Sequence, residues 1–504
     1  MMIPSCEEIL NLADRYDMIP VCSEVYADVV TPITLLRRIA EQSNRFYLLE
    51  SIEGGEKWGR YSFLGYDPVM HVTLKDGHMT IDSQLAEYPS RTIETRQPYD
   101  VLREILAKFQ SPRLKGQPPF TGGFVGYFAY AMIEYAEPTL HIKRGDANDM
   151  DLMLFDRVIA YDHLKQKIEI VVNMKTGRTI DANGEMHTST EFLMNQFGKA
   201  CADIEAVTRL IQENTPLRRL VSNEKPQFVC SVSREDYCRT VEKTKEYILD
   251  GDIFQAVISR QFTSPYSGNL LNAYRVLRTT NPSPYMVYMN IDGDEIMCSS
   301  PETLIRLDNG RLTTFPVAGS RPRGANETED RRLEQDLLAD EKELAEHNML
   351  VDLGRNDIGK IAAFGSVEVT EYQMVHRYSK IMHICSQVEG DIRPDCDGCS
   401  AIESLLPAGT LSGAPKIRAC EIIEELEQVP RGVYGGALGY LDFTGNLDTC
   451  IAIRMAVKKN GLVTVQAGGG IVADSVPEME YQESANKARA VILAIENAGE
   501  VNDR

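Results

Sequence analysis

The first third of the chain alternates short apolar runs with polar turns. Three runs rich in β-branched and aromatic residues are punctuated by Gly, Asp and Pro: RFYLLESIE (45–53), YSFLGYDPVMHVTLKDGHMTI (61–81) and DLMLFDRVIAYDHLKQKIEIVV (151–172). Such runs predict β-strands joined by turns. From about residue 188 to 213 the apolar spacing becomes helical. A polar, Pro-flanked segment follows, so we place the main boundary near residue 220 and predict two regions, 1–220 and 221–504.

In the second region helices and strands alternate. Ser233 is the expected N-cap of a first helix, and Asn309-Gly310 predicts a tight hairpin turn. One long polar helix is predicted through residues 334–354. A last helix is predicted just after Asp474, where Ser475 and Glu478 form an S-x-x-E capping box around a proline.

Charge and composition exclude several classes of partner. The net charge of −21 repels phosphate backbones, so nucleic acid and anionic membrane surfaces are not expected partners. We find neither a basic, apolar leader nor an apolar run of ~20 residues, which predicts a cytoplasmic protein. The eleven cysteines then indicate reduced thiols. We read Cys396 and Cys399 as thiols of a surface loop, because no second ligand pair follows them.

Two pairs of glutamates share the same i, i+3 spacing on predicted helices. Glu343 and Glu346 form one pair, and Glu480 and Glu483 form the other, shortly after the Gly468–Gly470 stretch and before Lys487. For either pair alone, a solvated helix face is the simpler interpretation. Four converging carboxylates would raise one another's pKa unless a hard cation such as Mg²⁺ lay among them. The glycine amides and basic residues would hold an anion beside it.

Five segments carry a resemblance to a known family: LLESIEGGEKWGRYSFLG (48–65), FPVAGSRPRG (315–324), AEHNMLVDLGRND (345–357), LLPAGTLSGAPKIRA (405–419) and GGGIVADSVPEMEYQESANKARA (468–490). In this order they resemble the large subunits of anthranilate synthases, which are chorismate-utilising enzymes. The resemblance covers nearly all of residues 44–497. It implies an α+β fold, a large α/β sandwich of mostly antiparallel sheets with flanking helices, and one Mg²⁺-dependent active site for the dianion chorismate.

The resemblance also implies roles for individual residues. Glu346 and Glu483 look like the Mg²⁺ ligands, with Glu343 and Glu480 as their companions in the catalytic site. His383 occupies the position of the general acid, and Thr410 that of a residue lining the pocket. The expected substrate-binding residues are Gly319, Ser320, Tyr434, Arg454, Gly468, Gly469, Gly470 and Lys487. Ser320 stands where relatives usually have threonine, which keeps the hydroxyl.

Two positions discriminate among reactions within the family. Isochorismate-type enzymes resemble one another in carrying a water-activating lysine at the position of Gln255. Aminodeoxychorismate synthases usually carry a lysine nucleophile at the position of Ala318. Direct attack by ammonia at C2 of chorismate, with loss of pyruvate and formation of anthranilate, is the chemistry that remains. A 2-amino-2-deoxyisochorismate synthase or an aminodeoxychorismate synthase is the alternative. A catalytically silent sensor or scaffold is disfavoured, because the predicted catalytic residues are present.

Partners and regulation follow from the same resemblance. No G-x-C-x-G nucleophile segment is present, so ammonia is expected from a separate glutamine amidotransferase subunit in a hetero-oligomer. Such enzymes catalyse the first step of tryptophan biosynthesis and are inhibited by L-tryptophan. The residues that match the two halves of that feedback site are Ser51, Lys57, Pro284, Tyr285 and Met286.

Overall fold

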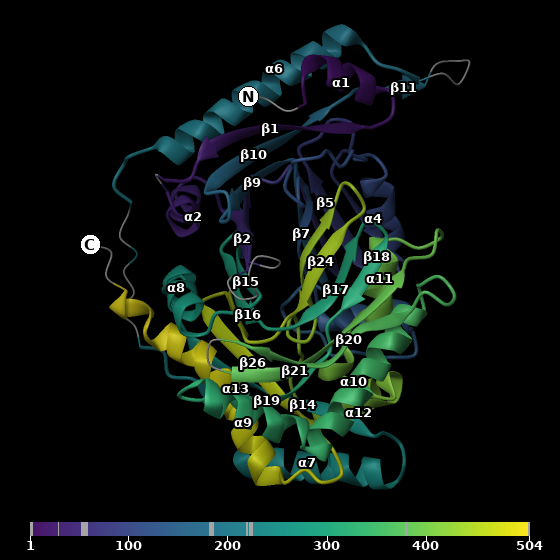
Figure 1. Cartoon of the computed structure of the whole chain (residues 1–504), viewed down its shortest axis with the longest axis vertical. Helices are drawn as coiled ribbons and strands as arrows, with labels where there is room; N and C mark the ends of the chain where they lie inside the picture. The colour runs from purple at the N-terminus through teal and green to yellow at the C-terminus, as the bar shows by residue number, and fades with distance from the viewer. Residues whose placement is uncertain are drawn as a thin grey trace.

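Two large antiparallel sheets pack face to face, with helices against their outer faces (Figure 1). The computed structural model describes residues 4–28, 30–51, 59–180, 186–217, 220, 225–378 and 381–501. Each sheet has twelve strands. The predicted α+β sandwich of antiparallel sheets with flanking helices is confirmed.

The spatial order of the strands differs from their order in the sequence. From one edge to the other, the first sheet contains β1 (Met18–Tyr26), β10 (Lys167–Lys175), β9 (Arg157–Asp162), β3 (Tyr61–Tyr66), β2 (Arg45–Glu50), β15 (Tyr285–Ile291), β16 (Asp294–Ser300), β25 (Met455–Lys459), β26 (Leu462–Ile471), β14 (Gln255–Pro265) and β13 (Val229–Cys230), with β22 (Gly413–Ala414) beside β14. The second contains β19 (Val317–Pro322), β21 (Ile381–Asp391), β18 (Arg311–Thr314), β17 (Thr303–Asp308), β24 (Leu447–Ile451), β23 (Ala437–Asp442), β7 (Gly123–Phe128), β8 (Met150–Phe155), β4 (Met70–Lys75), β5 (His78–Ser83) and β6 (Arg91–Glu94), with β20 (Glu368–Arg377) beside β21. Strands β11 (Thr179–Ile180) and β12 (Met186–His187) form a separate pair.

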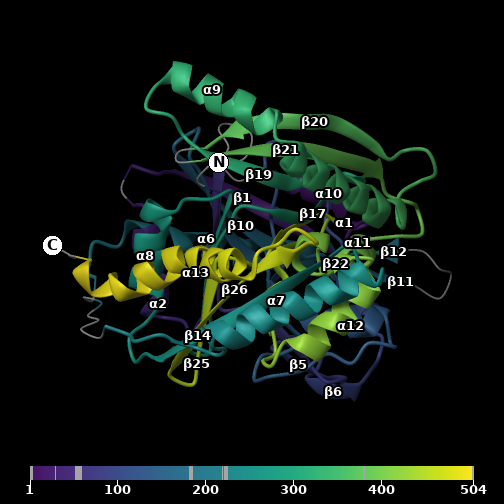
Figure 2. The same cartoon turned by 90° about the horizontal axis from the view of Figure 1, so that it is seen from below.

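Helices occupy the connections between these strands. They are α1 (Cys6–Ala13), α2 (Pro32–Ala40), α4 (Pro98–Leu106), α5 (Ile133–Ala136), α6 (Thr190–Gln212), α7 (Arg234–Leu249), α8 (Leu271–Thr280), α9 (Glu327–Leu338), α10 (Glu341–Gly359), α11 (Gly398–Leu405), α12 (Lys416–Leu426) and α13 (Pro477–Glu496), with short 3₁₀ turns η1 (Tyr130–Met132), η2 (Gly409–Leu411) and η3 (Ala498–Glu500). Figure 2 shows α7, α12 and α13 on one side of the molecule and α9 and α10 on the other. Among the described residues, no helix is long and apolar enough to cross a bilayer.

Both predicted regions contribute to both sheets. In the first sheet β2 pairs with β15, and in the second β7 pairs with β23, so strands from before and after residue 220 are hydrogen-bonded neighbours. An apolar core lies between the sheets, and β2, β7, β15 and β23 each contribute to it. Its buried residues include Tyr47, Val125, Val287 and Leu438. The division into 1–220 and 221–504 therefore stays a prediction about organisation along the chain.

Several local predictions are confirmed. The helix expected from 188 to 213 is α6, and Ser233 caps α7 by accepting a hydrogen bond from the Asp236 amide. The hairpin between β17 and β18 turns at Asn309 and Gly310, whose φ angles of 51° and 81° are those a tight two-residue turn requires. All eleven cysteines are free thiols.

Three other local predictions are wrong. The long helix over 334–354 is divided, because the Asp340 carboxylate accepts hydrogen bonds from the Lys342 and Glu343 amides and starts a new helix, α10. The capping box before α13 does not form, since Ser475 donates instead to the Glu480 carboxylate. Cys399 is not on a surface loop: Asp397 caps α11, which turns that thiol into the core.

Candidate active site

Two helices bring the predicted carboxylates to one end of the sandwich. Helix α10 packs on β19 and β21, and α13 packs on β26. A Cβ atom placed on Gly319 would lie 3.2 Å from Glu343 Oε2, and one on Gly469 would lie 3.0 Å from Glu480 Oε2. Glycine at both positions therefore lets the carboxylates approach the backbone of the strands.

The acidic side chains of α10 and α13 act on one another. Burial raises the pKa of Glu346, and the carboxylates of Glu343 and Glu483 raise it further. The pKa values of Glu343 and Glu480 are raised in the same way, by burial first and by Glu483 among other charges. The two glutamate pairs predicted from spacing alone thus face one site, and they are more than solvated helix surfaces.

Basic and hydroxyl groups offset part of this negative charge. Lys487 Nζ lies 2.7 Å from Glu483 Oε1 and donates to the Gly468 carbonyl at 3.2 Å. The Ser475 hydroxyl donates to Glu480 Oε1 at 2.7 Å. Glu483 and Lys487 remain about half exposed, with 53% and 46% of their side-chain surfaces accessible, so an incoming cation or anion can reach them.

The chemistry of this donor set fits the Mg²⁺ that the resemblance implies. Carboxylate oxygens are the ligands Mg²⁺ prefers, and a cation would favour the ionised forms of Glu343, Glu346 and Glu480, whose pKa values are raised by burial first and by neighbouring carboxylates second. No three His, Cys, Asp or Glu side chains of the described residues are close enough together to enclose a metal by themselves. Because Mg²⁺ commonly keeps water and substrate oxygens as ligands, two protein carboxylates are sufficient.

His383 lies on β21, across from Ser320 of β19. Its Nδ1 atom donates to the Gly319 carbonyl at 2.9 Å, and since a carbonyl only accepts, Nδ1 carries the proton. Burial lowers the pKa of His383, and the nearby Arg454 guanidinium lowers it further, against the opposing effect of the Gly319 bond. In the ligand-free protein the ring is therefore neutral, with the lone pair on Nε2.

Arg454 and His383 line a common cavity of about 60 Å³. Arg454 has a left-handed backbone conformation with φ of 49°, which is uncommon for a residue with a side chain. Its carbonyl accepts a hydrogen bond from the Ser299 amide at the end of β16. The guanidinium is thus presented from a fixed backbone position beside the imidazole.

Tyr434 and the Gly468–Gly470 stretch form the opposite part of the site. Burial raises the pKa of Tyr434, and the Gly468 backbone amide beside its hydroxyl opposes that effect. The glycines pair with β14 along one edge only, because the pairing of β26 with β25 ends at Val465. Gln255 of β14 fills the space over Gly470, where an added Cβ would lie 2.2 Å from its Nε2 atom.

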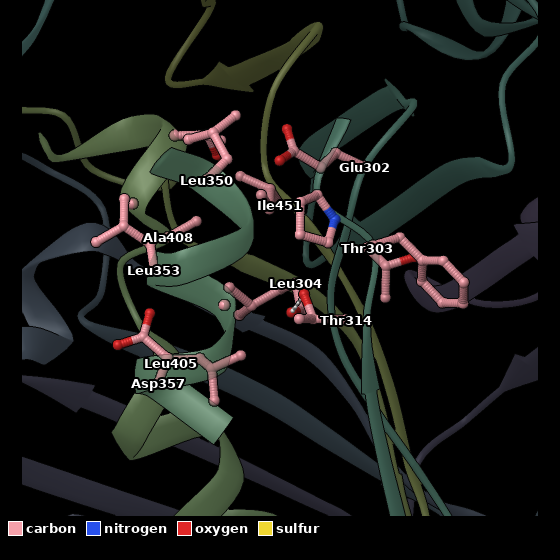
Figure 3. Close-up of a pocket in the computed structure, with 15 residues that line it drawn as sticks. Glu302, Thr303, Leu304, Thr314, Leu350, Leu353, Asp357, Leu405, Ala408 and Ile451 are labelled. Atoms are coloured by element: carbon pink, nitrogen blue, oxygen red, sulfur yellow. Dashed lines mark hydrogen bonds between the residues drawn. The ribbon is translucent and has the colours of Figure 1, made fainter. Parts of the chain in front are cut away.

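Glu302 is a candidate functional residue that the sequence analysis missed. Burial raises its pKa to about 7, while Thr410, Arg454 and Lys487 act in the opposite direction. It lies at one end of a small cavity between α10 and the β17 and β18 strands (Figure 3). The sequence signal was weak, a single glutamate after a proline at the end of a strand.

Thr410, predicted to line the pocket, is in the same cavity as Glu302. Its hydroxyl is buried and makes no hydrogen bond of good geometry with any group in the described ranges. The hydroxyl lies beside the Glu302 carboxylate, whose pKa it lowers, so the two groups belong to one polar cluster. Figure 3 shows Leu350 and Leu353 of α10 along the other wall of this cavity.

A second, larger cavity of about 380 Å³ lies apart from these groups, between the two sheets. Ser51, Pro284, Tyr285 and Met286, four of the five predicted feedback residues, line it together. Lys57 lies outside the described residues. The cavity has apolar walls and carries both signs of charge, from Glu50 and Asp448 and from three arginines: Arg60, Arg113 and Arg306.

Comparison with known proteins places the chain in a family. Residues 44–493 match the family model described as chorismate binding enzyme. The chain is 46% identical to anthranilate synthase component 1 of Acetivibrio thermocellus, covering 99% of this chain and 100% of that one, and 44% identical to that of Pseudomonas aeruginosa, covering 97% and 98%.

Solved structures agree with this assignment. The crystal structure of anthranilate synthase component I from Streptococcus pneumoniae TIGR4 superposes with a TM-score of 0.74 at 34% identity, covering 93% of this chain and 98% of that one. The menaquinone-specific isochorismate synthase MenF of Escherichia coli superposes with a TM-score of 0.69 over 97% of this chain and 98% of that one, but at 18% identity it supports the fold alone. The chain therefore belongs to the family of chorismate binding enzymes.

Proposed function

We propose that this chain is the chorismate-binding component of a cytoplasmic anthranilate synthase, which converts chorismate and ammonia to anthranilate, pyruvate and water. The observation that carries the proposal is the 46% identity over 99% of the chain to a protein of that name. The site supports it, because it combines clustered carboxylates, glycine-rich strand backbone and an arginine beside a histidine. These are the groups that a dianionic substrate and a divalent cation need.

Binding of chorismate is assigned to the positively charged side of the site. The planar guanidinium of Arg454 suits bidentate binding of one substrate carboxylate. Gly319, Ser320, Tyr434, Lys487 and the three glycines of β26 would contact the rest of the substrate. Glu346 and Glu483 would hold Mg²⁺, with Glu343 and Glu480 beside them, and the bound ion would neutralise the charge of the second carboxylate.

The reaction needs a proton at the C4 hydroxyl of chorismate. Ammonia adds at C2, the protonated C4 oxygen leaves as water, and elimination of pyruvate then gives the aromatic ring. We assign the proton to His383, because the negative charge of the bound substrate raises the pKa of a nearby imidazole. Glu302 is a second candidate donor, since a carboxyl with a pKa of about 7 is partly protonated at neutral pH.

Two residues favour ammonia over other nucleophiles. Gln255 is buried against Gly470, and its neutral amide cannot deprotonate water as an amine can. Ala318, a buried residue of β19, provides no amine nucleophile. Ammonia would come from a separate glutamine amidotransferase subunit, as the designation component 1 of the relatives suggests.

Feedback inhibition by L-tryptophan is part of the proposal and concerns the cavity between the sheets. Its volume of about 380 Å³ is at the lower end of ligand pockets, which suits an amino acid. Apolar walls would contact the indole ring, and the acidic and basic side chains would contact the amino and carboxylate groups.

The decisive experiment is product identification. Purified chain, chorismate, an ammonium salt and Mg²⁺ should produce fluorescent anthranilate, verified by mass spectrometry. Glutamine should replace ammonium only when an amidotransferase subunit is added. A product with the mass of aminodeoxyisochorismate, or one with the 4-amino substitution of aminodeoxychorismate, would overturn the proposal in favour of one of those enzymes.

A further inference from the structure

Arg260 is a fully buried cation close to the carboxylate site. It lies on β14, opposite Ala467 of β26 and one residue from the position that pairs with Gly468. Only 1% of its surface is exposed. Among the described residues it forms no ion pair with a carboxylate, and the groups that it contacts are a hydroxyl, a carbonyl, a thiol and aromatic rings. Burying a charged side chain among neutral partners lowers the stability of the fold, so we expect an arginine at this position to have a function.

The polar contacts of Arg260 are concentrated on one turn of α13. Nη2 donates to the Tyr481 carbonyl at 2.6 Å, and Nε donates to the Ser484 hydroxyl at 3.0 Å. The guanidinium also lies 3.8 Å from the centre of the Tyr481 ring. Ser484 is itself completely buried and donates back to the Tyr481 carbonyl, which closes the network.

This turn is the one that carries the predicted acidic residues. Glu480 precedes Tyr481, and Glu483 precedes Ser484, so the contacts of Arg260 hold the backbone next to both carboxylates. The Arg260 charge and the Glu480 carboxylate act in opposite directions on the pKa of the Tyr237 phenol, after the larger effect of burial, so both charges lie near that ring.

We propose that Arg260 is a positioning residue that fixes the first turns of α13 over β26, and thereby sets how strongly the Glu480 and Glu483 carboxylates of that turn contribute to binding a divalent cation. Arginine suits this role better than lysine, because its planar fork directs two separate N–H groups at two acceptors while its face packs on an aromatic ring. The proposal rests on the proposed function in one respect, that these carboxylates bind a divalent cation.

The test measures cation binding without turnover. Mn²⁺ is titrated into the full chain with chorismate present and ammonia and glutamine absent, and free Mn²⁺ is followed by electron paramagnetic resonance. We expect Arg260→Met to weaken Mn²⁺ binding by at least about tenfold, within the range for groups that orient metal ligands, and Arg260→Lys to lie between it and the parent. Ser484→Ala, a milder change in the same network, should weaken binding by a few fold.

Val463→Ala is the matched control, since Val463 is a fully buried residue of β26 far from the glycine stretch. It should lower the melting temperature and leave Mn²⁺ affinity within about twofold of the parent. If Arg260→Met does not fold, the lysine and Ser484→Ala variants carry the comparison. Parent-like Mn²⁺ affinity in the folded Arg260 and Ser484 variants, or an equal loss in Val463→Ala, would overturn the inference.

The Glu483→Gln variant separates this inference from the proposed function. If the parent binds Mn²⁺ and Glu483→Gln does not, while the Arg260 variants bind normally, only the role of Arg260 is wrong. If the parent itself binds no Mn²⁺, or Glu483→Gln binds as the parent does, the proposed cation site is wrong and the inference falls with it. The anthranilate assay tests the reaction independently of either result.

Discussion

The carboxylate site and the cavity between the sheets differ in the partners of their acidic side chains. At the carboxylate site, Glu343, Glu346 and Glu480 have raised pKa values because burial and neighbouring negative charges act together. In the larger cavity, Glu50 accepts hydrogen bonds from Tyr274 and Ser62 and forms an ion pair with Arg278 at 2.8 Å. Asp448 accepts from the Tyr285 hydroxyl at 2.7 Å.

The difference is one of pairing: neighbouring negative charges act on one another at the first site, whereas Glu50 at the second has a guanidinium partner. At the first site the proposed Mg²⁺ would relieve the raised pKa values of the buried carboxylates. The second region contains about 380 Å³ of space, and its Glu50 carboxylate is paired with Arg278 without a ligand. Substitutions confined to one region should therefore leave the properties of the other unchanged.

Removal of a predicted cation ligand should have the largest effect. Glu346→Gln or Glu483→Gln should lower kcat/KM for anthranilate formation by on the order of 10³-fold or more, because a bound cation contributes several kcal/mol. Fluorescence of anthranilate at limiting Mg²⁺ measures this. Glu341→Gln, an exposed glutamate in the first turn of the same helix, is the control. Parent-like activity in either ligand variant would remove the cation assignment.

Replacement of His383 should act mainly on the chemical step. We expect His383→Ala to lower kcat by ~10²–10⁴-fold with a smaller change in KM, as loss of a general acid does. His376→Ala, on the neighbouring strand β20 and paired across from His383, is the matched control. A change in KM with kcat retained would instead mean that the imidazole only positions the substrate.

The pH dependence should identify the proton donor. Glu302 has a raised pKa of about 7, so it is protonated below that value and loses its proton above it. If it donates the proton, kcat/KM falls about tenfold per pH unit above about pH 7, and Glu302→Gln gives a lower rate without that alkaline limb. An unchanged limb in Glu302→Gln would assign the acid to His383 alone.

Regulation should be separable from catalysis. Ser51→Phe should fill part of the cavity between the sheets and abolish inhibition by tryptophan, with kcat in its absence within about twofold of the parent. Ser51→Ala removes only the hydroxyl and should keep the space. Linkage requires that chorismate weaken tryptophan binding by the factor by which tryptophan weakens chorismate binding. Inhibition that persists unchanged in Ser51→Phe would contradict the proposed effector site.

Stability should respond with opposite signs in the two regions. Arg278→Met leaves the buried Glu50 carboxylate without its cation and should lower the free energy of unfolding by ~1–3 kcal/mol. Glu346→Gln should raise the melting temperature. The folded-state pKa of Glu346 is above its unfolded value, so its ionised form destabilises the protein increasingly as pH rises through that pKa. Thermal denaturation compared between buffer near the ordinary glutamate pKa of 4.5 and neutral buffer should show the difference in melting temperature between variant and parent widening at the higher pH.

Local motifs in the sequence predict where residues lie on an element, whereas burial in the folded protein leaves no local pattern. The i, i+3 spacing of Glu480 and Glu483 places both on one flank of a helix, because the spacing follows from helix geometry alone. Pro284 and Ser51 lie far apart in the sequence and were joined only through the resemblance, which the common cavity supports. Glu302 was missed because its significance lies in its burial beside Arg454 and Lys487, and no local pattern encodes that environment.

Fold class was predictable, whereas helix boundaries were less so. The apolar runs predicted strands and the resemblance implied antiparallel sheets, yet nothing local predicted that β2 would pair with β15, which lies in the other half of the chain. The division between α9 and α10 depended on whether Asp340 would cap a new helix or remain inside a longer one. That choice is decided by packing of both helices on β19, a tertiary effect that propensity does not contain.

The pairing of β2 with β15 and of β7 with β23 also has a consequence during synthesis. When the ribosome has released only the N-terminal region, β2 and β7 each lack a neighbour that has yet to be translated. Their open edges carry apolar residues such as Phe46, Leu48 and Phe124, which invite pairing with other nascent chains. We therefore expect both sheets to remain incomplete until the segment through β23 has been translated, and neither region to complete either sheet by itself.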